Sequence, residues 1–400
     1  MKTIAIFSGY ALPHLGGVER YTENLKNELI NNGFKVVIVS SNYDKTKDYK
    51  IIDGHTTYYK VPVYKIFSSR YPIIKHNKEY KEIIKELEKE KIDRIIVNTR
   101  FYLTSLMGAK FGKKHNIEVS LIEHGSSHLS VNNIVLDFFG KIYEHVLTHF
   151  VKKYVDKYYG VSSDATNWQK HFGIKSDGIW YNSVYRFDKG IKIEKSKKDI
   201  IFLYAGRVLK QKGVEDAIEV FNKLSKGYKN IKLWIAGDGD QYQYLVDKYG
   251  KNKKIIFYGK VDFERLKTLY TKANVFLHPS KYPEGLPTSI IEAGLLECAI
   301  IASPKGGTRT FINRDNGRII ESKDELYNSM KELIDNPSMI IKMGKNMKQT
   351  VIDNFIWNDN CKKIIKDLKI KKWLMLITFL FFWKFYFIYF VYWISFFFRR

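Results

Sequence analysis

The chain has 400 residues, which is too long for one ordinary domain and favours two domains with an appendage. Its formal net charge of +25 predicts an acidic partner, either nucleic acid or an anionic membrane surface. The basic residues are spread along the chain without a zinc-finger spacing or an RNA-binding motif, so we expect no nucleic-acid partner. The two cysteines, Cys298 and Cys361, do not support a disulfide framework and fit a reducing cytosol.

The first half of the chain alternates short apolar runs with helical patterns. The opening MKTIAIFSGY has one early charge and a short apolar run, which predicts a strand over 4–7 rather than a secretory signal. Apolar residues at helical spacing from Val18 to Leu29 predict a helix that ends at Gly33. A solvated helix is expected over 78–91, and further strands over 36–39, 94–97, 119–122 and 157–161.

The same alternation starts again at Asp199, where the runs IIFLYAG, IKLWIAG, KIIFYG, NVFLHPS and AIIAS are separated by helical patterns. Strands that alternate with helices predict the α/β class with a parallel, doubly wound sheet. Two such runs predict two Rossmann-like domains, over 1–185 and 186–360, with the polar stretch 185–198 at their boundary. Ligands of such sheets bind beyond the carboxyl ends of the strands, so we expect a cleft between facing loops.

A pair of glutamates in the second domain is the most informative local feature. In PSKYPEGLPTSIIEAG (279–294), Glu284 and Glu292 flank a Gly-Leu-Pro turn and the start of an apolar helix. Pro287 suits the first turn of a helix, where a missing N–H costs nothing. The free N–H groups and the positive dipole end of that helix favour an anion such as a diphosphate. Taken alone, the pair is equally consistent with this ligand-binding role and with a solvated loop residue at 284 and a surface helix residue at 292.

A second charged motif, AGRVLKQKGVEDAI (205–218), follows the first strand of the second domain. Arg207 and Lys212 lie between two glycines that suit a strand-to-helix turn. Arginine offers a planar fork for phosphate oxygens, and lysine adds a mobile point charge. A solvated basic loop is the alternative in so basic a protein.

With these motifs in this order, the chain resembles the retaining glycosyltransferases of family 4 over roughly residues 1–360. Members of that family have the GT-B fold, in which two Rossmann-like domains face a cleft. The resemblance implies that Glu284 contacts the donor sugar as a catalytic residue and that Glu292 contacts the nucleotide ribose. It further implies that Arg207 and Lys212 clamp the donor diphosphate. The expected backbone donors to phosphate are Leu286, Thr288 and Ser289.

The resemblance also assigns roles in the first domain. Gly16 and Gly17 match a glycine pair that approaches the donor phosphates, although a simple turn is the alternative. His124, in LIEHGSSH, matches a histidine near the reaction centre, with a purely structural histidine as the alternative. Asn182 matches an asparagine of structural role at the domain junction. The other histidines of this region are expected to be surface or packing residues, namely His128, His145, His149 and His171.

The sequence departs from the family pattern after Gly306 and Gly307, where the family usually has a glutamate and this chain has Thr-Arg-Thr. This departure bears on nucleotide and sugar selectivity. Asp238 and Asp240 form an Asp-x-Asp that could hold a metal, but they resemble the family's Gly-Asp-Gly turn, so we expect no metal site and no cofactor. The glycine-bearing turns lack the G-x-G-x-x-G fingerprint, which disfavours a nicotinamide-linked oxidoreductase.

The segment 361–400 is a basic stretch followed by an apolar tail. Residues 373–398 contain a single charge, Lys384, and a helix of that length, about 39 Å, crosses a hydrocarbon core of about 30 Å with tilt. Six lysines precede the tail and two arginines follow it, so the positive-inside rule predicts that the domains face the cytoplasm. A helix lying in the interface or a hairpin bent near Lys384 is the alternative to a membrane-spanning helix.

The resemblance and the tail together predict a membrane-anchored retaining glycosyltransferase. Its donor would be a UDP- or GDP-sugar, and its acceptor a lipid-linked glycan at the cytoplasmic face of the cell membrane, in polysaccharide or cell-wall synthesis. The family needs no divalent metal for this reaction. The alternatives are a sugar-nucleotide epimerase on the same fold and a non-catalytic membrane scaffold that binds sugar nucleotides.

Overall fold

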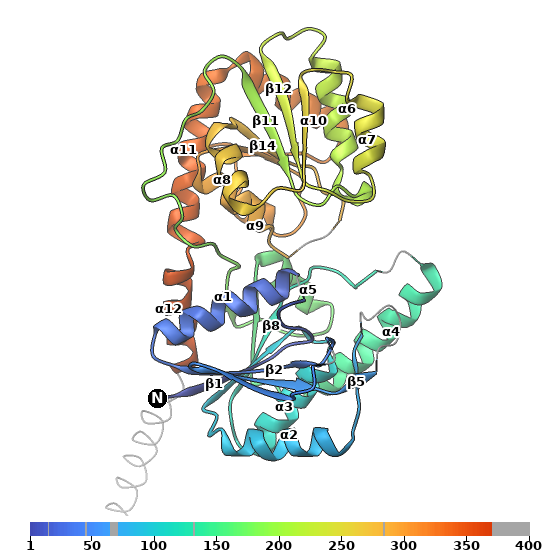
Figure 1. Cartoon of the computed structure of the whole chain (residues 1–400), viewed down its shortest axis with the longest axis vertical. Coiled ribbons are helices and arrows are strands. Elements are labelled where there is room, and N and C mark those ends of the chain that lie inside the picture. The colour runs from blue at the N-terminus through green and yellow to red at the C-terminus, as the bar shows by residue number, and fades with distance from the viewer. Residues whose placement is uncertain (15, 45, 65–70, 131–132, 283–284, 370–400) are drawn as a thin grey trace, which may run out of the picture. The chain divides into compact units, whose positions relative to one another are not determined.

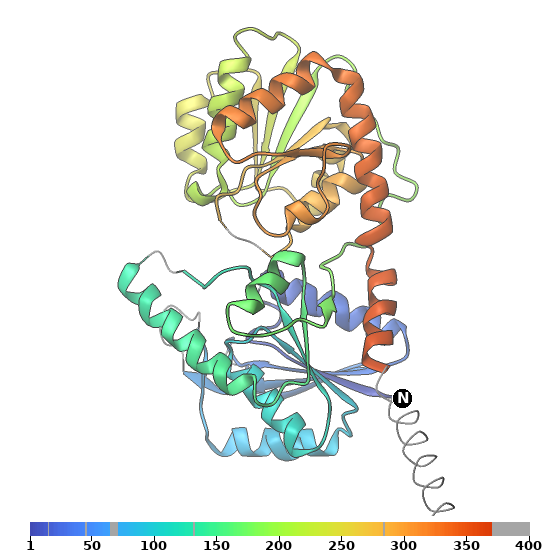
Figure 2. The same cartoon turned by 180° about the vertical axis from the view of Figure 1, so that it is seen from behind.

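The computed structural model describes residues 1–369 apart from 15, 45, 65–70, 131–132 and 283–284. By contacts, the chain divides into one unit of Met1–Asn360 and a second of Cys361–Arg400. Both main sheets belong to the first unit, and Figures 1 and 2 show it from opposite sides. The chain forms an α/β fold with two largely parallel sheets, as the alternation of strands and helices predicts.

The first sheet has eight strands in the order β10-β9-β8-β7-β1-β2-β4-β3. All its pairings are parallel except that of β3 with β4. Its strands are β1 (Thr3–Phe7), β2 (Lys35–Ser41), β3 (Lys50–Asp53), β4 (Thr56–Val61), β7 (Arg94–Asn98), β8 (Val119–Glu123), β9 (Lys157–Gly160) and β10 (Gly178–Ile179). The helices of this half are α1 (Gly17–Asn31), α2 (Lys78–Lys89), α3 (Leu103–Lys114), α4 (Ile134–Val151) and α5 (Ser163–Lys170).

The second sheet has six parallel strands in the order β13-β12-β11-β14-β15-β16. Its strands are β11 (Ile200–Ala205), β12 (Ile231–Ala236), β13 (Ile255–Gly259), β14 (Val275–His278), β15 (Ala299–Ala302) and β16 (Gly317–Ile319). The helices of this half are α6 (Val214–Leu224), α7 (Tyr242–Tyr249), α8 (Phe263–Lys272), α9 (Thr288–Leu295), α10 (Lys323–Asp335) and α11 (Pro337–Asn354), and α12 (Trp357–Lys369) follows. Short 3-10 turns lie at Lys210–Lys212 and Thr308–Thr310.

The central strands are buried because helices cover both faces of each sheet. In the second sheet, one apolar cluster joins the strands to α8, α9 and α11, and another joins them to α6, α7 and α10 (Figure 1). Strands covered on both sides consist of continuous apolar residues, as IIFLYA of β11 and AIIA of β15 do. This pattern explains why these strands are visible in the sequence.

The strand order places the candidate site. β1 lies between β2 and β7, and β11 lies between β12 and β14, so the chain reverses its direction across each sheet at these central strands. Loops that leave the carboxyl ends of strands on either side of such a reversal diverge and open a crevice. The motifs around Gly17, His124, Arg207 and Leu286 all lie in or beside such loops.

Three local features differ from the sequence-based expectation. The β3–β4 hairpin adds an antiparallel edge to the first sheet, and a two-stranded sheet forms from β5 (Val63–Tyr64) and β6 (Ile73–Ile74). Pro287 is the residue that caps α9 rather than a residue of its first turn, with φ −71° and ψ 113°. The Pro287 carbonyl still accepts the first hydrogen bond of the helix, so the N–H groups of Thr288 and Ser289 remain at its start.

The predicted membrane segment over 373–398 lies outside the described residues. Among the residues that the structure does describe, no helix is both long and apolar enough to cross a bilayer.

Candidate functional site

A cavity of about 340 Å³ lies where loops of the two sheets meet within the first unit. It brings together five of the predicted catalytic and donor-binding residues, from loops or helix ends after β1, β8, β11 and β14, and Asn182 lines it as well. The five residues are Gly17, His124, Arg207, Lys212 and Leu286. Gly16, Thr288, Ser289 and Glu292 do not line this cavity, and Glu284 lies outside the described residues.

The basic loop after β11 presents its two cations to this cavity. Arg207 is exposed and Lys212 is partly buried, at the end of the 3-10 turn. Gly213 then has a left-handed φ of +68°, and a Cβ there would lie 2.1 Å from the carbonyl oxygen of Pro279. Only glycine fits that position, so the predicted strand-to-helix turn is built as the sequence indicates. The Tyr204 hydroxyl donates a hydrogen bond of 2.7 Å to the Arg207 carbonyl and fixes the start of the loop.

The loop before α9 lies directly against the first domain. A Cβ on Gly285 would lie 2.1 Å from the carbonyl oxygen of His124, so the two backbones touch here. The Asn182 side chain donates a hydrogen bond of 3.2 Å to the Leu286 carbonyl, which agrees with a structural role at the junction. The beginning of α9 is therefore held close to His124.

Glu292 lies on α9 behind this loop and is partly buried. The Tyr270 hydroxyl donates a hydrogen bond of 3.3 Å to its Oε2. Burial raises the pKa of Glu292, while the nearby Arg20 of α1 and the Tyr270 hydrogen bond lower it. Glu292 is therefore not a fully solvated residue of a surface helix, although it does not line the cavity.

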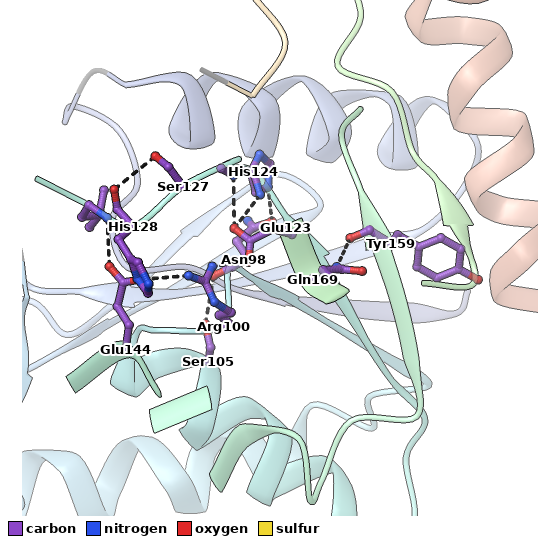
Figure 3. Close-up of polar contacts among 12 residues, drawn as sticks. Asn98, Arg100, Ser105, Glu123, His124, Ser127, His128, Glu144, Tyr159 and Gln169 are labelled. Carbon is purple, nitrogen blue, oxygen red and sulfur yellow. Dashed lines mark hydrogen bonds and ion pairs between the residues drawn. The ribbon is translucent and has the colours of Figure 1, made fainter. Parts of the chain in front are cut away.

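His124 is held in a defined orientation (Figure 3). Its Nε2 lies 3.0 Å from Oδ1 of Asn98, whose amide in turn donates a hydrogen bond of 2.7 Å to Thr22. The ring also meets the edge of Tyr21 at 4.8 Å between centroids. Burial lowers the pKa of His124 to about 3, so the imidazole is neutral at neutral pH. It can form hydrogen bonds to a sugar, but it supplies no positive charge.

The glycine pair of the first domain is divided between two tasks. Gly16 caps α1 with an extended backbone, and a Cβ there would lie 2.3 Å from a carboxylate oxygen of Glu19. Gly17 is exposed, lines the cavity and would place a Cβ in open space, with no atom within 4 Å. A side chain at 16 would therefore displace only the end of the Glu19 side chain, whereas the space beside Gly17 is open.

Thr99 lines the same cavity and is not predicted from the sequence. Its φ of +65° is unusual for a β-branched residue. Its buried Oγ1 has no hydrogen-bond partner among the described residues. Backbone strain of this kind collects at functional sites, but no sequence pattern marks it. Thr99 is therefore a further candidate for contact with a ligand.

Two other sequence features lie away from the cavity. Asp238 accepts a hydrogen bond of 2.8 Å from the Gly239 N–H, and in the described part of the chain neither Asp238 nor Asp240 joins a group of three ligating side chains. Arg309, which stands in the departing Thr-Arg-Thr segment, forms an ion pair with Glu321. The Gly307 N–H donates a hydrogen bond of 2.8 Å to Asp164 of α5.

A polar network lies beneath the loop that carries His124 (Figure 3). The fully buried Arg100 pairs with Glu123 at 2.6 Å and with Glu144 at 2.7 Å. Glu123 also accepts hydrogen bonds from the backbone N–H groups of His124 and Gly125, both at 3.1 Å. This network positions the loop after β8 and could not be inferred from residue spacing.

The two halves of the chain match two family models. Residues 15–184 match the model described as Glycosyltransferase Family 4, and residues 187–350 match that of Glycosyl transferases group 1. A glycosyltransferase of Methanocaldococcus jannaschii, itself uncharacterized, is 28% identical over 385 residues, which are 92% of this chain and 97% of the relative. The GPI3 subunit of phosphatidylinositol N-acetylglucosaminyltransferase from Saccharomyces cerevisiae is 22% identical over 325 residues, 76% of this chain and 68% of the relative.

The fold has close counterparts among solved structures. The Anabaena HepE structure in complex with UDP superposes with a TM-score of 0.69 at 14% identity, over 92% of this chain and 99% of that chain. The architecture is therefore that of the GT-B-like proteins, with parallel sheets in two domains. The chain itself is a glycosyltransferase, composed of a family 4-like domain followed by a group 1 domain.

Proposed function

We propose that this glycosyltransferase moves a sugar from a nucleoside diphosphate sugar, UDP- or GDP-linked, to its acceptor with retention of the anomeric configuration. The observation that carries the proposal is the cavity that gathers Arg207, Lys212, His124 and Gly17. The bound UDP named for the HepE structure supports a nucleotide donor. The residues of the cavity supply cations, a neutral hydrogen-bonding ring and an unobstructed glycine, which together suit a phosphorylated sugar.

Charge develops on the leaving diphosphate during transfer. Arg207 and Lys212 provide the positive charge that stabilises it, and the N-terminus of α9 adds aligned N–H groups. The reaction as proposed requires no divalent metal at the diphosphate, because these groups neutralise it. His124 contributes hydrogen bonds, and Glu284 contacts the donor sugar. Retention follows from the family resemblance, in which leaving-group departure and acceptor attack occur on the same face.

The acceptor is proposed to be lipid-linked, and α4 supports this. Its residues 134, 138, 142, 146 and 150 are all large, apolar and 45–90% exposed, and they repeat every four positions along one face. Val135 and Phe139 widen the stripe. The opposite face, with Glu144, Leu147 and Val151, is already buried in the domain. A helix that is apolar on its solvent side fits contact with a membrane or a lipid.

Further support for a membrane acceptor comes from the tail and from a relative. The apolar segment 373–398 and the six lysines before it would anchor the chain at a cytoplasmic membrane face. The name of the GPI3 relative includes a phosphatidylinositol acceptor. We therefore propose that the enzyme acts at the cell membrane, in the synthesis of a polysaccharide or cell-wall glycan.

A transfer assay tests the proposal. The full-length chain in lipid nanodiscs would be incubated with radiolabelled UDP-, GDP-, ADP- and dTDP-sugars and a membrane lipid extract. Label should move from one UDP- or GDP-sugar into the organic phase. The Glu284→Gln variant should lose transfer while it melts at the wild-type temperature. Glu264→Gln, a change of the same chemistry on the exposed end of α8, should remain active.

Two results would contradict the proposal. Label that enters only a water-soluble product would refute the lipid acceptor, and transfer that survives in Glu284→Gln would refute the donor site. The alternatives remain an epimerase and a non-catalytic scaffold, and no feature of the cavity specifically favours either. Isomerised donor sugar without transfer would indicate the epimerase.

A further inference from the structure

Three histidines that are far apart in the sequence come together beside the loop after β8. His128 lies in that loop, His145 on α4 and His171 at the end of α5. One ring nitrogen of each lies within 4.8 Å of the other two. No motif in the sequence groups them, and we expect them from the sequence to be surface or packing residues. Their convergence needs a physical explanation, since the rings of His145 and His171 are exposed.

The distances are close to those of a metal site. The Nε2 atoms of His145 and His171 are 3.3 Å apart. Tetrahedral Zn²⁺ binds histidine nitrogens at about 2.0–2.1 Å, which places two such nitrogens roughly 3.3 Å from each other. The remaining nitrogen, on His128, lies within 4.8 Å of these two, and rotation of the side chains on binding would close the remaining gap.

His128 also has the supporting contact that metal-binding histidines usually have. Its Nδ1 lies 2.8 Å from Oε2 of the fully buried Glu144, and with the proton on Nδ1 this contact leaves the lone pair of Nε2 for a metal. A histidine that binds a metal through one nitrogen almost always donates the other N–H to a carboxylate or carbonyl. The same Glu144 oxygen is held by Arg100, at 2.7 Å. Glu144, held by Arg100, thus fixes the orientation of the His128 ring (Figure 3).

The surroundings favour a cation further. Trp168 stacks on the ring of His171 at 4.7 Å between centroids and 6° between planes, which orients that ring. Beneath the cluster, Arg100 is paired with both Glu123 and Glu144, so its positive charge is compensated. Imidazole nitrogens bind Zn²⁺ in preference to Mg²⁺ or Ca²⁺.

From this geometry we propose that His128, His145 and His171 bind a Zn²⁺ ion. The three nitrogens leave the fourth tetrahedral position to water or another small ligand. The ion joins the loop of His128, which also lines the donor cavity, to α4 and α5. It therefore fixes the first-domain side of the cavity and lies apart from the cations proposed to bind the diphosphate.

Metal titration tests this proposal without any assay of transfer. The full-length chain, purified in detergent with a tag free of histidine and stripped with a chelator, would be titrated with Co²⁺ and then with Zn²⁺. We expect one ion per chain, the visible absorption of tetrahedral Co²⁺, its displacement by Zn²⁺, and a higher melting temperature in Zn²⁺. The variants His145→Ala and His171→Ala should each lose at least 100-fold in affinity.

His149→Ala is the matched control, since His149 is exposed on the same helix one turn beyond His145 and is not part of the cluster. It should bind Co²⁺ and Zn²⁺ as the wild type does. All variants should melt alike in chelator, which separates lost binding from lost folding. No binding by the wild type, or equal binding by His145→Ala, His171→Ala and His149→Ala, would overturn the proposal.

Discussion

At the scale of single residues, His124 shows how burial sets chemical character. Its Nε2 pairs with Asn98, and burial lowers its pKa to about 3, so it stays neutral where a free histidine would begin to gain a proton. A neutral ring can hold a sugar hydroxyl without competing with Arg207 and Lys212 for the diphosphate. This division of tasks separates hydrogen bonding to the sugar from charge neutralisation at the phosphates.

The depressed pKa of His124 predicts a loss of stability in acid. Above pH 6.5 the ring is neutral in both the folded and the unfolded state. As the pH falls from 6.5 toward 3, only the unfolded state takes up the proton, so the free energy of unfolding decreases. At pH 5 this loss should be on the order of 1–2 kcal/mol relative to pH 7.5. Unfolding of the wild type and His124→Gln at both pH values measures it, and an equal pH dependence in the two proteins would contradict it.

Replacement of Gly17 by alanine tests whether the donor approaches the backbone there. A methyl group there meets no atom within 4 Å, so Gly17→Ala should fold and melt as the wild type does. If the donor phosphates approach this backbone, the same methyl should weaken donor binding by roughly 10-fold or more, which corresponds to about 1.4 kcal/mol. Isothermal titration with the donor measures the effect. Unchanged affinity would show that the donor does not approach Gly17.

At the scale of elements, α4 has two apolar faces with different partners. One face is buried against the first sheet, and the other is the exposed stripe that starts at Ile134. Helical periodicity alone does not separate these faces, because a helix that is apolar all round also fits a buried core helix. The structure resolves the ambiguity by showing which side the domain covers.

The exposed stripe predicts that α4 contacts lipid. Phe139 and Ile341 are matched sites, since they are 61% and 59% exposed and lie on α4 and α11. Each would be replaced by cysteine and labelled with an environment-sensitive fluorophore in the full-length chain, and the native Cys298 and Cys361 are buried. In anionic vesicles that contain a lipid-borne quencher, the probe at 139 should shift to the blue and be quenched. The probe at 341 should not respond, and equal responses would contradict the prediction.

At the scale of the whole molecule, the sequence predicted the two sheets well because their central strands are covered on both faces. The runs IIFLYAG and AIIAS are mostly apolar and end near glycine or a polar turn. Both β11 and β15 could therefore be predicted from the sequence. The β3–β4 hairpin was not visible, because KIID is exposed and TTYYKV mixes polar with aromatic residues. An exposed edge strand such as β3 leaves no clear apolar signal.

The site was predicted only where its residues belong to a contiguous motif. Arg207, Lys212 and Leu286 lie in such motifs, and the cavity includes them. Thr99 was missed because its strained backbone has no signature in the sequence. The three histidines were missed because their proximity depends on how the loop after β8, α4 and α5 pack together. The boundary near 185 and the tail remain predictions from the sequence.

Closure of the cleft between the two domains would require the chain to bend in the boundary stretch 185–198, and hydrogen bonds limit where it can bend. Val184 donates a hydrogen bond of 2.9 Å to the Phe355 carbonyl and accepts one of 3.1 Å from the Trp357 N–H. The segment before 185 is therefore paired with the segment around 355–357. Within the stretch 185–198, Lys195 Nζ donates to the carbonyls of Tyr270 and Ala273 at 2.9 and 2.5 Å. These contacts fix Lys195 to the second domain, so we expect closure to turn on residues before it.

We propose that the cavity binds a nucleoside diphosphate sugar through the loop after β11. A donor-binding measurement decides whether it does. The full-length chain in detergent would be titrated with UDP-, GDP-, ADP- and dTDP-sugars, alongside Arg207→Ala and the control Lys210→Ala. Lys210 is an exposed cation of the same loop that does not line the cavity. One donor should bind selectively, and Arg207→Ala should lose roughly 10- to 100-fold in affinity, since a hydrogen bond to a charged group contributes about 1.5–3 kcal/mol. Equal binding by wild type, Arg207→Ala and Lys210→Ala would contradict the account.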